Sequence, residues 1–135
     1  MPDPRHARAT RLTLGITAVS FLIIGLGFLL VPVAWAGSMQ VALGSALART
    51  DFRATYGGFN TAFGAFLLVC ALRTPWHRPG LLAAVLSLYG FAGGRLLGWA
   101  LEGELAPLMR TLLLIELGAG TLALWLYRRD ATAPG

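Results

Sequence analysis

Six polar residues that could do chemistry lie within, or at the edge of, long apolar runs: Asp51, Arg53, Tyr56, Asn60, Arg95 and Glu116. A charge at the centre of a bilayer costs about 2.5–3.5 kcal/mol, so such residues pair, or they line a ligand site or an ion path. A carboxylate and a guanidinium can join through two parallel hydrogen bonds. These residue types therefore offer ligand binding, proton transfer at Glu116, or a salt bridge that only fixes the helices.

Helical spacing indicates that these polar residues lie near one another. Arg95 and Glu116 lie roughly 9 Å and roughly 14 Å inside the ends of their apolar runs, at 1.5 Å per residue. Residues three or four apart share a helix face, as do Arg53, Tyr56, Gly57, Asn60 and Gly64. We expect Arg95 and Glu116 to meet each other, or to meet Asp51 and Arg53. An internal salt bridge and a polar pocket that opens outward are the two interpretations left open.

The other reactive residue types form no recognisable catalytic or metal-binding set. Cys70 is the single cysteine, and His6 and His77 fall in separate flanks that are predicted to be solvent loops. Neither histidine has another metal ligand near it in the sequence. We therefore predict no catalytic residue, no metal and no cofactor.

Composition predicts the class of protein. Of the 135 residues, 56% are hydrophobic and 13% are charged, whereas an average soluble domain has about 25% charged residues. The basic residues are all arginine, and the formal net charge is +5. Because the arginines are scattered between apolar runs, they indicate topogenic charge beside membrane helices, and no nucleic-acid partner is expected.

The apolar runs predict an all-α, four-helix transmembrane bundle, a single domain over residues 1–135. Each run has at least the 20 or so residues that cross a bilayer. The predicted helices cover residues 12–36, 52–72, 81–101 and 107–127. Asp51 suits the N-cap of the second helix, with a ligand-facing role as the alternative. Gly103 suits the end of the third helix, and Pro107 suits the first turn of the fourth.

The first run could also be a cleaved signal peptide, because arginines precede it and Ala34-Trp35-Ala36 resembles a cleavage site. Signal peptides have an apolar core of only about 7–15 residues, so we expect this helix to be retained. Residues 37–50 are predicted to form a linker, part of which could be a short helix at the membrane interface.

The arginines predict an orientation. Seven flank the predicted termini and the turn at residues 73–80: Arg5, Arg8, Arg11, Arg73, Arg78, Arg128 and Arg129. Positive charge stays in the cytoplasm, so both termini are predicted to be cytoplasmic.

Glycines predict where helices approach closely. Gly90, Gly94 and Gly98 form a smooth ridge on the third helix, and Ala54, Gly58 and Ala62 form a similar strip on the second. Gly57 and Gly58 are the predicted packing glycines of the second helix. Small residues let helix backbones approach closely in membranes. We expect the second and third helices to be a close pair, with homodimerisation as the alternative use of the ridge.

Two elements of the sequence carry a family resemblance: Arg53-Ala54-Thr55-Tyr56-Gly57-Gly58 and Gly94-Arg95-Leu96. With the acidic turn at Glu102 and with Glu116, they resemble the bacterial family known as domain of unknown function 4345. The resemblance covers nearly the whole chain. It implies a small four-helix, multi-pass protein of the bacterial inner membrane, and it implies no activity.

These observations favour a non-enzymatic binding or scaffold protein. Its outward polar pocket would hold a lipid-like or small anionic ligand, or a partner helix. The alternative is a small proton- or ion-coupled transporter that uses Glu116. A membrane enzyme that uses Asp51, Tyr56 and Glu116 ranks third, because no nucleophile–base pair accompanies these residues. The predicted partners are the lipid bilayer and a membrane protein, either another protein or a second copy of the chain.

Overall fold

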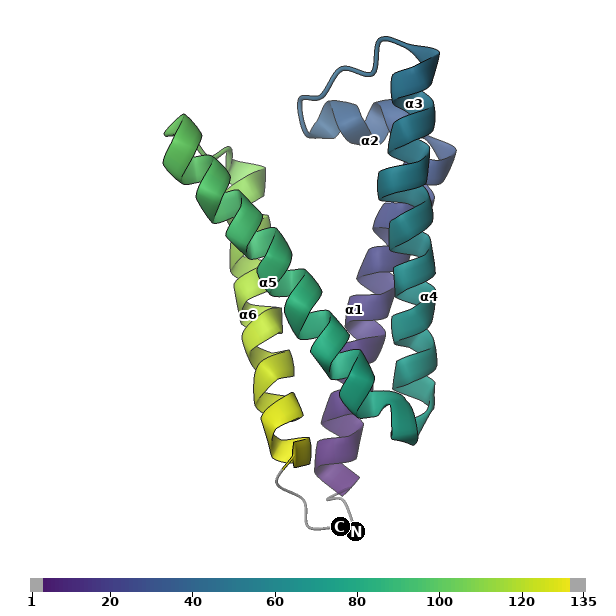
Figure 1. Cartoon of the computed structure of the whole chain (residues 1–135), viewed down its shortest axis with the longest axis vertical. Coiled ribbons are helices and arrows are strands. Elements are labelled where there is room, and N and C mark those ends of the chain that lie inside the picture. The colour runs from purple at the N-terminus through teal and green to yellow at the C-terminus, as the bar shows by residue number, and fades with distance from the viewer. Residues whose placement is uncertain (1–3, 132–135) are drawn as a thin grey trace. The chain divides into compact units, whose positions relative to one another are not determined.

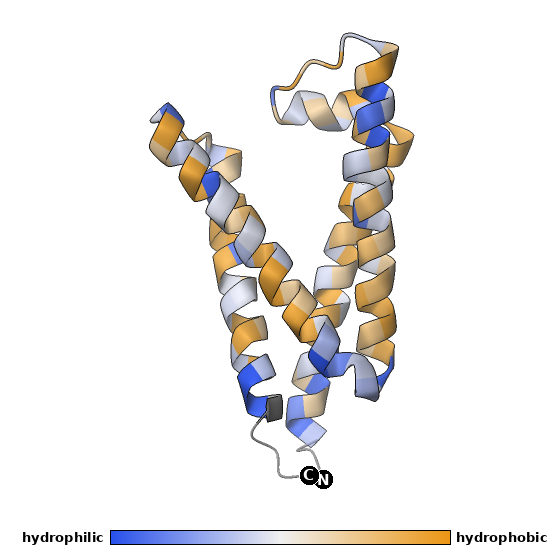
Figure 2. Ribbon diagram, in the orientation of Figure 1, coloured by the Kyte–Doolittle hydropathy of each residue, from blue (hydrophilic) through white to orange (hydrophobic). Residues whose placement is uncertain are grey.

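The computed structural model describes residues 4–131, and within them it contains helices and no strand (Figure 1). Four helical spans are long and apolar enough to cross a membrane: Pro4–Leu30, Ala46–Leu72, Thr74–Glu102 and Pro107–Arg129. Figure 2 shows that apolar residues dominate the middle of these helices, while hydrophilic residues lie toward their ends. The predicted all-α fold with four long apolar helices, each a candidate membrane span, is confirmed.

Helix α1 (Pro4–Leu30) begins and ends earlier than predicted, and a short helix, α2 (Pro32–Ser38), follows it. Pro32 causes the break, because it has no N–H to donate back into the helix and it disfavours a helical residue before it. Val31 accordingly has φ −133° and ψ 60°. The predicted first helix over residues 12–36 is therefore wrong at both ends.

The second span is continuous but contains three segments. Helix α3 (Ala46–Phe52) leads into the π-helix η1 (Arg53–Gly58) and then into α4 (Phe59–Leu72). Its N-cap is Ser45, whose hydroxyl accepts a hydrogen bond from the backbone N–H of Ala48 at 3.0 Å. The predicted N-cap at Asp51 is wrong, because the preceding residues already form a helix and Ser45 is also a favourable capping residue.

The third and fourth spans start and stop largely as expected. A 3₁₀ turn, η2 (Thr74–Trp76), precedes α5 (His77–Glu102), and α6 (Pro107–Ala131) follows. Gly103 has φ 75° and ends α5, and Pro107 opens α6, as predicted. Neither histidine lies in a solvent loop: His6 is part of α1, and the buried His77 places Nε2 3.3 Å from the carbonyl oxygen of Ala71.

The chain forms two compact units. We call residues 15–69 the α1–α4 unit, and the described residues of 1–14 and 70–135 the α5–α6 unit. The two units are described separately below, and a single domain over residues 1–135 stays a prediction.

Glycines on both helices pack α1 against the η1–α4 segment inside the α1–α4 unit. A Cβ added to Gly25 would lie 2.5 Å from the backbone nitrogen of Thr61, and one added to Gly64 would lie 2.9 Å from the carbonyl oxygen of Ala18. A Cβ at Gly57 would lie 2.9 Å from the backbone nitrogen of Leu29. The two backbones are therefore close enough that only glycine fits without displacing a neighbour.

An aromatic cluster closes the α2–α3 end of the same unit. The buried ring of Phe28 lies 5.7 Å from Trp35, 6.1 Å from Phe52 and 5.3 Å from Tyr56 between centroids. Phe52 and Tyr56 stack on each other at 4.7 Å. Because α2 folds back after Pro32, its Trp35 reaches this cluster.

In the α5–α6 unit, helices α5 and α6 form a hairpin (Figure 1). Gly120 of α6 lies against Tyr89, where an added Cβ would be 2.9 Å from the ring. The Tyr89 hydroxyl lies 3.0 Å from the hydroxyl of Thr121. This hairpin sets the facing positions of α5 and α6, including the two charged residues described next.

Candidate functional site

Arg95 of α5 and Glu116 of α6 form a two-pronged ion pair. The Arg95 Nε donates to both Glu116 carboxylate oxygens, at 3.1 Å and 2.9 Å, and one terminal nitrogen donates to Oε1 at 2.9 Å. The Glu116 side chain is 10% exposed and that of Arg95 is 22% exposed. The first of the two expected pairings of these residues is therefore present.

The geometry of the hairpin brings these residues together. Arg95 is seven residues before Glu102 at the end of α5, and Glu116 is nine residues after Pro107 at the start of α6. At 1.5 Å per residue they lie about 11 Å and about 14 Å from the connecting loop, so two antiparallel helices place them at nearly the same level. The other Arg95 terminal nitrogen lies 2.8 Å from the sulfur of Met109.

The glycine ridge lies beside Arg95 on α5. A Cβ added at Gly90, Gly94 or Gly98 would meet no atom of its own unit within 4 Å. Inside the α5–α6 unit the ridge is therefore an open backbone surface, and α6 packs on another face of α5. The predicted close pairing of the second and third helices involves both units and stays a prediction.

The polar residues of the second span surround the π-helix η1. Its wider turn is visible in the bond from the backbone N–H of Phe59 to the carbonyl oxygen of Ala54, five residues earlier. The buried Asn60 donates its side-chain amide to the carbonyl oxygen of Tyr56 at 2.6 Å. Side chains that bond to these carbonyls support the π-turn, and such turns are frequent at functional sites.

Arg53 connects η1 to α1. Its Nε donates to the carbonyl oxygen of Leu29 at 3.1 Å. Leu29 belongs to the last turn of α1, whose carbonyls lack partners within the helix. Arg53 thus stabilises the end of α1 and fixes η1 beside it.

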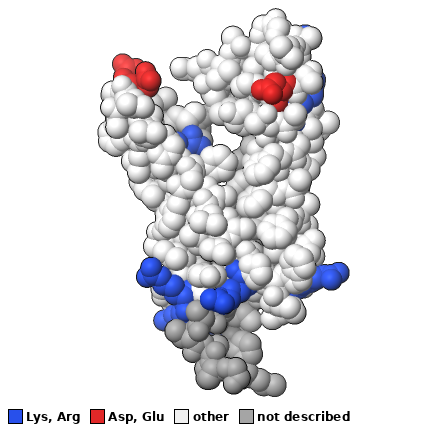
Figure 3. Space-filling view, in the orientation of Figure 1, with Lys and Arg blue, Asp and Glu red and all other residues white. Residues whose placement is uncertain are grey.

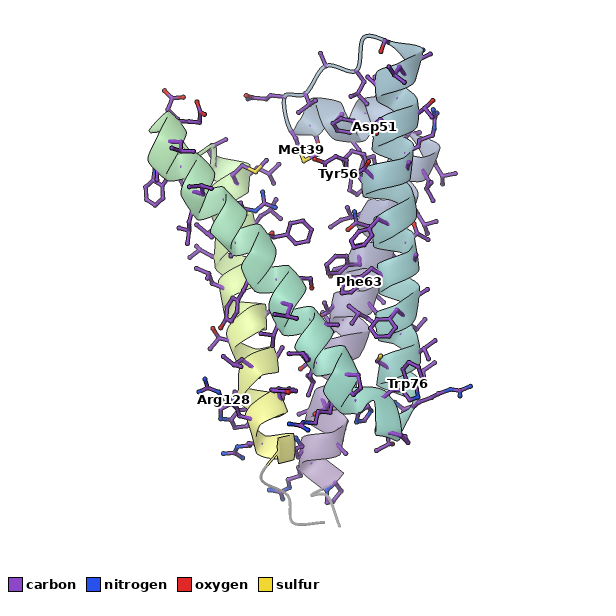
Figure 4. The ribbon with its side chains drawn as sticks, in the orientation of Figure 1. Met39, Asp51, Tyr56, Phe63, Trp76 and Arg128 are labelled. Carbon is purple, nitrogen blue, oxygen red and sulfur yellow. The ribbon has the colours of Figure 1, made fainter. Side chains whose placement is uncertain are left out.

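The remaining predicted site residues of the second span have different surroundings. Asp51 is exposed on α3, and Tyr56 is 40% exposed while its ring joins the aromatic cluster (Figure 4). Gly57 is buried against Leu29, whereas a Cβ at Gly58 would have only an ordinary contact at 3.7 Å.

The structure thus divides the predicted polar cluster between the two units. Arg53, Tyr56 and Asn60 gather at η1, with Asp51 on the preceding helix, whereas Arg95 and Glu116 form their own pair. A pocket that combines all six residues stays a prediction.

Sequence reasoning missed several contacts that position these groups. Met109 was not expected beside Arg95, and Gly25, Gly80 and Gly120 were not expected at close approaches. Ala18 and Gly25 lie seven residues apart on one face of the first helix, and this pair of small residues could have indicated a packing face. No pattern in the sequence indicates a sulfur acceptor at Met109.

Comparison with known proteins gives one match. The family described as Domain of unknown function (DUF4345) matches residues 9–127. The chain belongs to this family. No curated protein and no solved structure matches it. The matched segment of this DUF4345 domain contains the Arg95–Glu116 pair, η1 and every predicted site residue.

Proposed function

We propose that this DUF4345 protein is a non-enzymatic binding or scaffold protein of the membrane. Its α5–α6 unit would present Arg95 to the acceptor oxygens of a lipid-like or small anionic ligand, or of a partner helix. The observation that supports this most is the Arg95–Glu116 pair. All hydrogen bonds that Glu116 accepts within the described part of the chain come from the Arg95 guanidinium, and these bonds do not use all of the guanidinium's N–H groups.

The donor count supports binding at Arg95. A guanidinium has five N–H groups. Among the described residues, the bonds to Glu116 engage Nε–H and one N–H of a terminal nitrogen, and Met109 sulfur receives one more. Two N–H groups are left for an acceptor, and Arg95 is 22% exposed. An oxygen-rich headgroup or a backbone carbonyl would satisfy them.

The neighbouring glycines support access to this donor. Gly94 precedes Arg95 directly and Gly98 follows one turn later, and neither carries a side chain that could cover the guanidinium. An acyl chain or a small-residue helix face could lie on this ridge with its polar group at Arg95. The ridge and the donor together make a ligand surface from adjacent residues of one helix.

The pair geometry disfavours the alternative of a proton-coupled transporter. To release and rebind protons in a cycle, Glu116 would have to leave a guanidinium that holds both of its oxygens. Breaking a buried pair strands the other charge at a cost of about 3–5 kcal/mol. We therefore place the carrier hypothesis second and an enzyme that uses Asp51, Tyr56 and Glu116 third.

The test is to extract and identify what co-purifies with the protein in a mild detergent. The wild type should retain a stoichiometric lipid-like species, and the pair-deleted variant Arg95→Leu/Glu116→Leu should lose it. Arg110→Leu is the matched control, because this exposed arginine also lies on α6 but bonds to the carbonyl of Leu105. Equal ligand content in all three proteins would contradict binding at Arg95. Proton flux in liposomes that Glu116→Gln abolishes would instead favour the transporter.

We propose further that the protein is a multi-pass protein of the bacterial inner membrane with both termini in the cytoplasm. The arginine asymmetry supports this orientation. In a Cys70→Ala background, single cysteines at Ser38 and Gly103 should react with an impermeant thiol reagent added outside intact cells, and one at Thr74 should not. Labelling at the Thr74 position alone would mean that the orientation is the opposite of the proposed one.

A separate measurement tests whether the first helix is retained. Intact-mass measurement should find residues 1–36 present, and a mature N-terminus at Gly37 would contradict retention of the first helix.

A further inference from the structure

The net charge of the protein is concentrated in three short stretches of sequence. Residues 1–11, 73–78 and 128–130 contain seven arginines and two aspartates, a formal charge of +5, which is the net charge of the whole chain. The other four arginines are balanced by the other four acidic residues. Any long-range attraction of anions by fixed side-chain charge therefore originates in these stretches.

The fold brings the described residues of these three stretches to one end of the α5–α6 unit. This end is formed by the start of α1, by η2 and the start of α5, and by the end of α6 (Figure 1). Figure 3 shows arginine side chains gathered there, while acidic side chains lie at the opposite end of α5. Arg8, Arg11, Arg73, Arg78 and Arg128 are all exposed. We call this surface the arginine end.

Helix stabilisation explains only part of this charge. Arg128 and Arg129 lie in the last turn of α6, where cations interact favourably with the helix dipole. Arg78 lies in the first turn of α5, where a cation is unfavourable, and that turn contains no acidic residue and no side-chain cap. Arg78 therefore lies where the helix itself gains nothing from a positive charge.

Aromatic rings hold two of these guanidiniums in place. The Arg78 guanidinium carbon lies 4.9 Å from the centroid of the Tyr127 ring, and that of Arg129 lies 4.0 Å from the centroid of Trp125. Trp76 and Trp125 are 45% and 47% exposed, and Figure 4 labels Trp76 and Arg128 at this end. Exposed tryptophans at helix ends are typical of the headgroup level of a bilayer.

We infer that the arginine end is a docking surface for anionic phospholipid headgroups of the adjacent leaflet. Arg78 and Arg128 are its central residues, because the Tyr127 ring holds Arg78 beside the last turn of α6, which carries Arg128. Clusters of Lys and Arg beside a membrane helix attract anionic lipids by about 1 kcal/mol per residue, or about fivefold in affinity. Arg78 lies about 26 Å along α5 from Arg95, at 1.5 Å per residue, so this surface is separate from the proposed ligand site.

The experiment measures binding of phosphatidylglycerol and phosphatidylcholine to the full-length protein in detergent by native mass spectrometry. The wild type should bind phosphatidylglycerol at least about tenfold more tightly than phosphatidylcholine, as expected when two or more arginines contribute. Arg78→Gln/Arg128→Gln should reduce this preference to within about threefold. The control Arg49→Gln/Arg110→Gln removes the same charge from elsewhere and should keep the wild-type preference.

Two further measurements make the result decisive. Phosphatidylglycerol should raise the thermal unfolding temperature at low salt and much less at high salt, whereas millimolar inorganic phosphate should not raise it. Stabilisation by phosphate alone would mean an anion site and not a lipid surface, and would overturn the proposal. An equal loss of preference in both double variants would also overturn it. So would equal binding of both lipids by the wild type, a comparison that requires no variant to fold.

Discussion

The α1–α4 unit and the α5–α6 unit hold their helices together in different ways. In the α1–α4 unit, Gly25, Gly57 and Gly64 bring two backbones into close contact. In the α5–α6 unit, side chains bond across the hairpin, as in the Arg95–Glu116 pair. Lipid is as apolar as a leucine side chain, so membrane helices associate through close packing or through polar bonds and gain little from hydrophobic burial. Each unit relies mainly on one of these two solutions.

The difference has a consequence for function. Close packing at Gly25, Gly57 and Gly64 leaves no room for a ligand between α1 and the η1–α4 segment, because a neighbour already covers each of these three glycines. Polar bonding across the hairpin leaves Gly90, Gly94 and Gly98 of α5 open inside their unit, and it keeps donors available at Arg95. This open surface beside Arg95 is the reason that the proposed ligand site is placed on the α5–α6 unit.

Removal of one partner of the ion pair should have the largest effect on stability. Arg95→Leu and Glu116→Leu should each destabilise the protein by about 3–5 kcal/mol, because each leaves a buried charge unpaired. The double variant should recover much of this loss, and a double-mutant cycle of unfolding in detergent measures the coupling. Additive losses with no recovery would show that the two charges are not energetic partners.

A methyl group at a packed glycine should have the next largest effect. Gly25→Ala should destabilise by about 1–3 kcal/mol, because the added carbon overlaps the Thr61 backbone and overpacks the contact. Gly15→Ala on the same helix is the control, since its added carbon would meet no atom within 4 Å. It should be neutral or stabilising by up to about 1 kcal/mol, from helix propensity. Similar effects of the two substitutions would contradict glycine packing as the main contact of the α1–α4 unit.

Arg53 is the polar exception in the α1–α4 unit, and its removal should have a smaller effect. Arg53→Gln should destabilise by about 0.5–1 kcal/mol, because the bond to the Leu29 carbonyl is exposed and replaceable by water. Arg49→Gln, one turn earlier on the same span, should change the unfolding free energy less. If Arg53→Gln costs as much as Gly25→Ala, the polar bond and not the glycine contact dominates this unit.

Tyr89→Phe should have the smallest effect of the four. It removes only the hydroxyl contact to Thr121 and leaves the ring against Gly120. Hydrogen bonds between membrane helices contribute about 0.6 kcal/mol on average, and we expect a loss near that value. A loss as large as that from Arg95→Leu would place the main polar contact of the hairpin at Tyr89.

Local features of the fold were predictable where a single residue or a short run decides them. Gly103 ends α5 because glycine adopts the positive φ required there without a steric penalty, and Pro107 opens α6 because the first turn needs no donor from it. The helix start at Ser45 was missed because Asp51 is an equally good cap, and only the path of the preceding chain selects between them. The break before Pro32 was underestimated because hydropathy continues unchanged through it.

The candidate site was predictable in its residue types and not in its contacts. Arg95 and Glu116 stood out because an ionisable residue is rare in an apolar run. Their partners were not fixed, because a 3.6-residue period gives the face of a helix but not the neighbour that this face meets. The bond from Arg53 to the Leu29 carbonyl depends on where α1 ends, which the sequence reading placed six residues too late.

The sequence by itself determined that the chain has the composition of a membrane protein, that it has four long apolar runs, and that seven of its arginines lie in three short polar stretches. These follow from hydropathy and charge, which add up residue by residue along the chain. Only the tertiary structure decided that Arg95 pairs with Glu116, and that the arginine stretches meet at one end of the α5–α6 unit. It also decided that neighbours cover Gly25 and Gly64, whereas Gly90 and Gly94 are open in their own unit. These depend on how each helix is rotated and paired, which is a property of several segments together and is not encoded in any one of them.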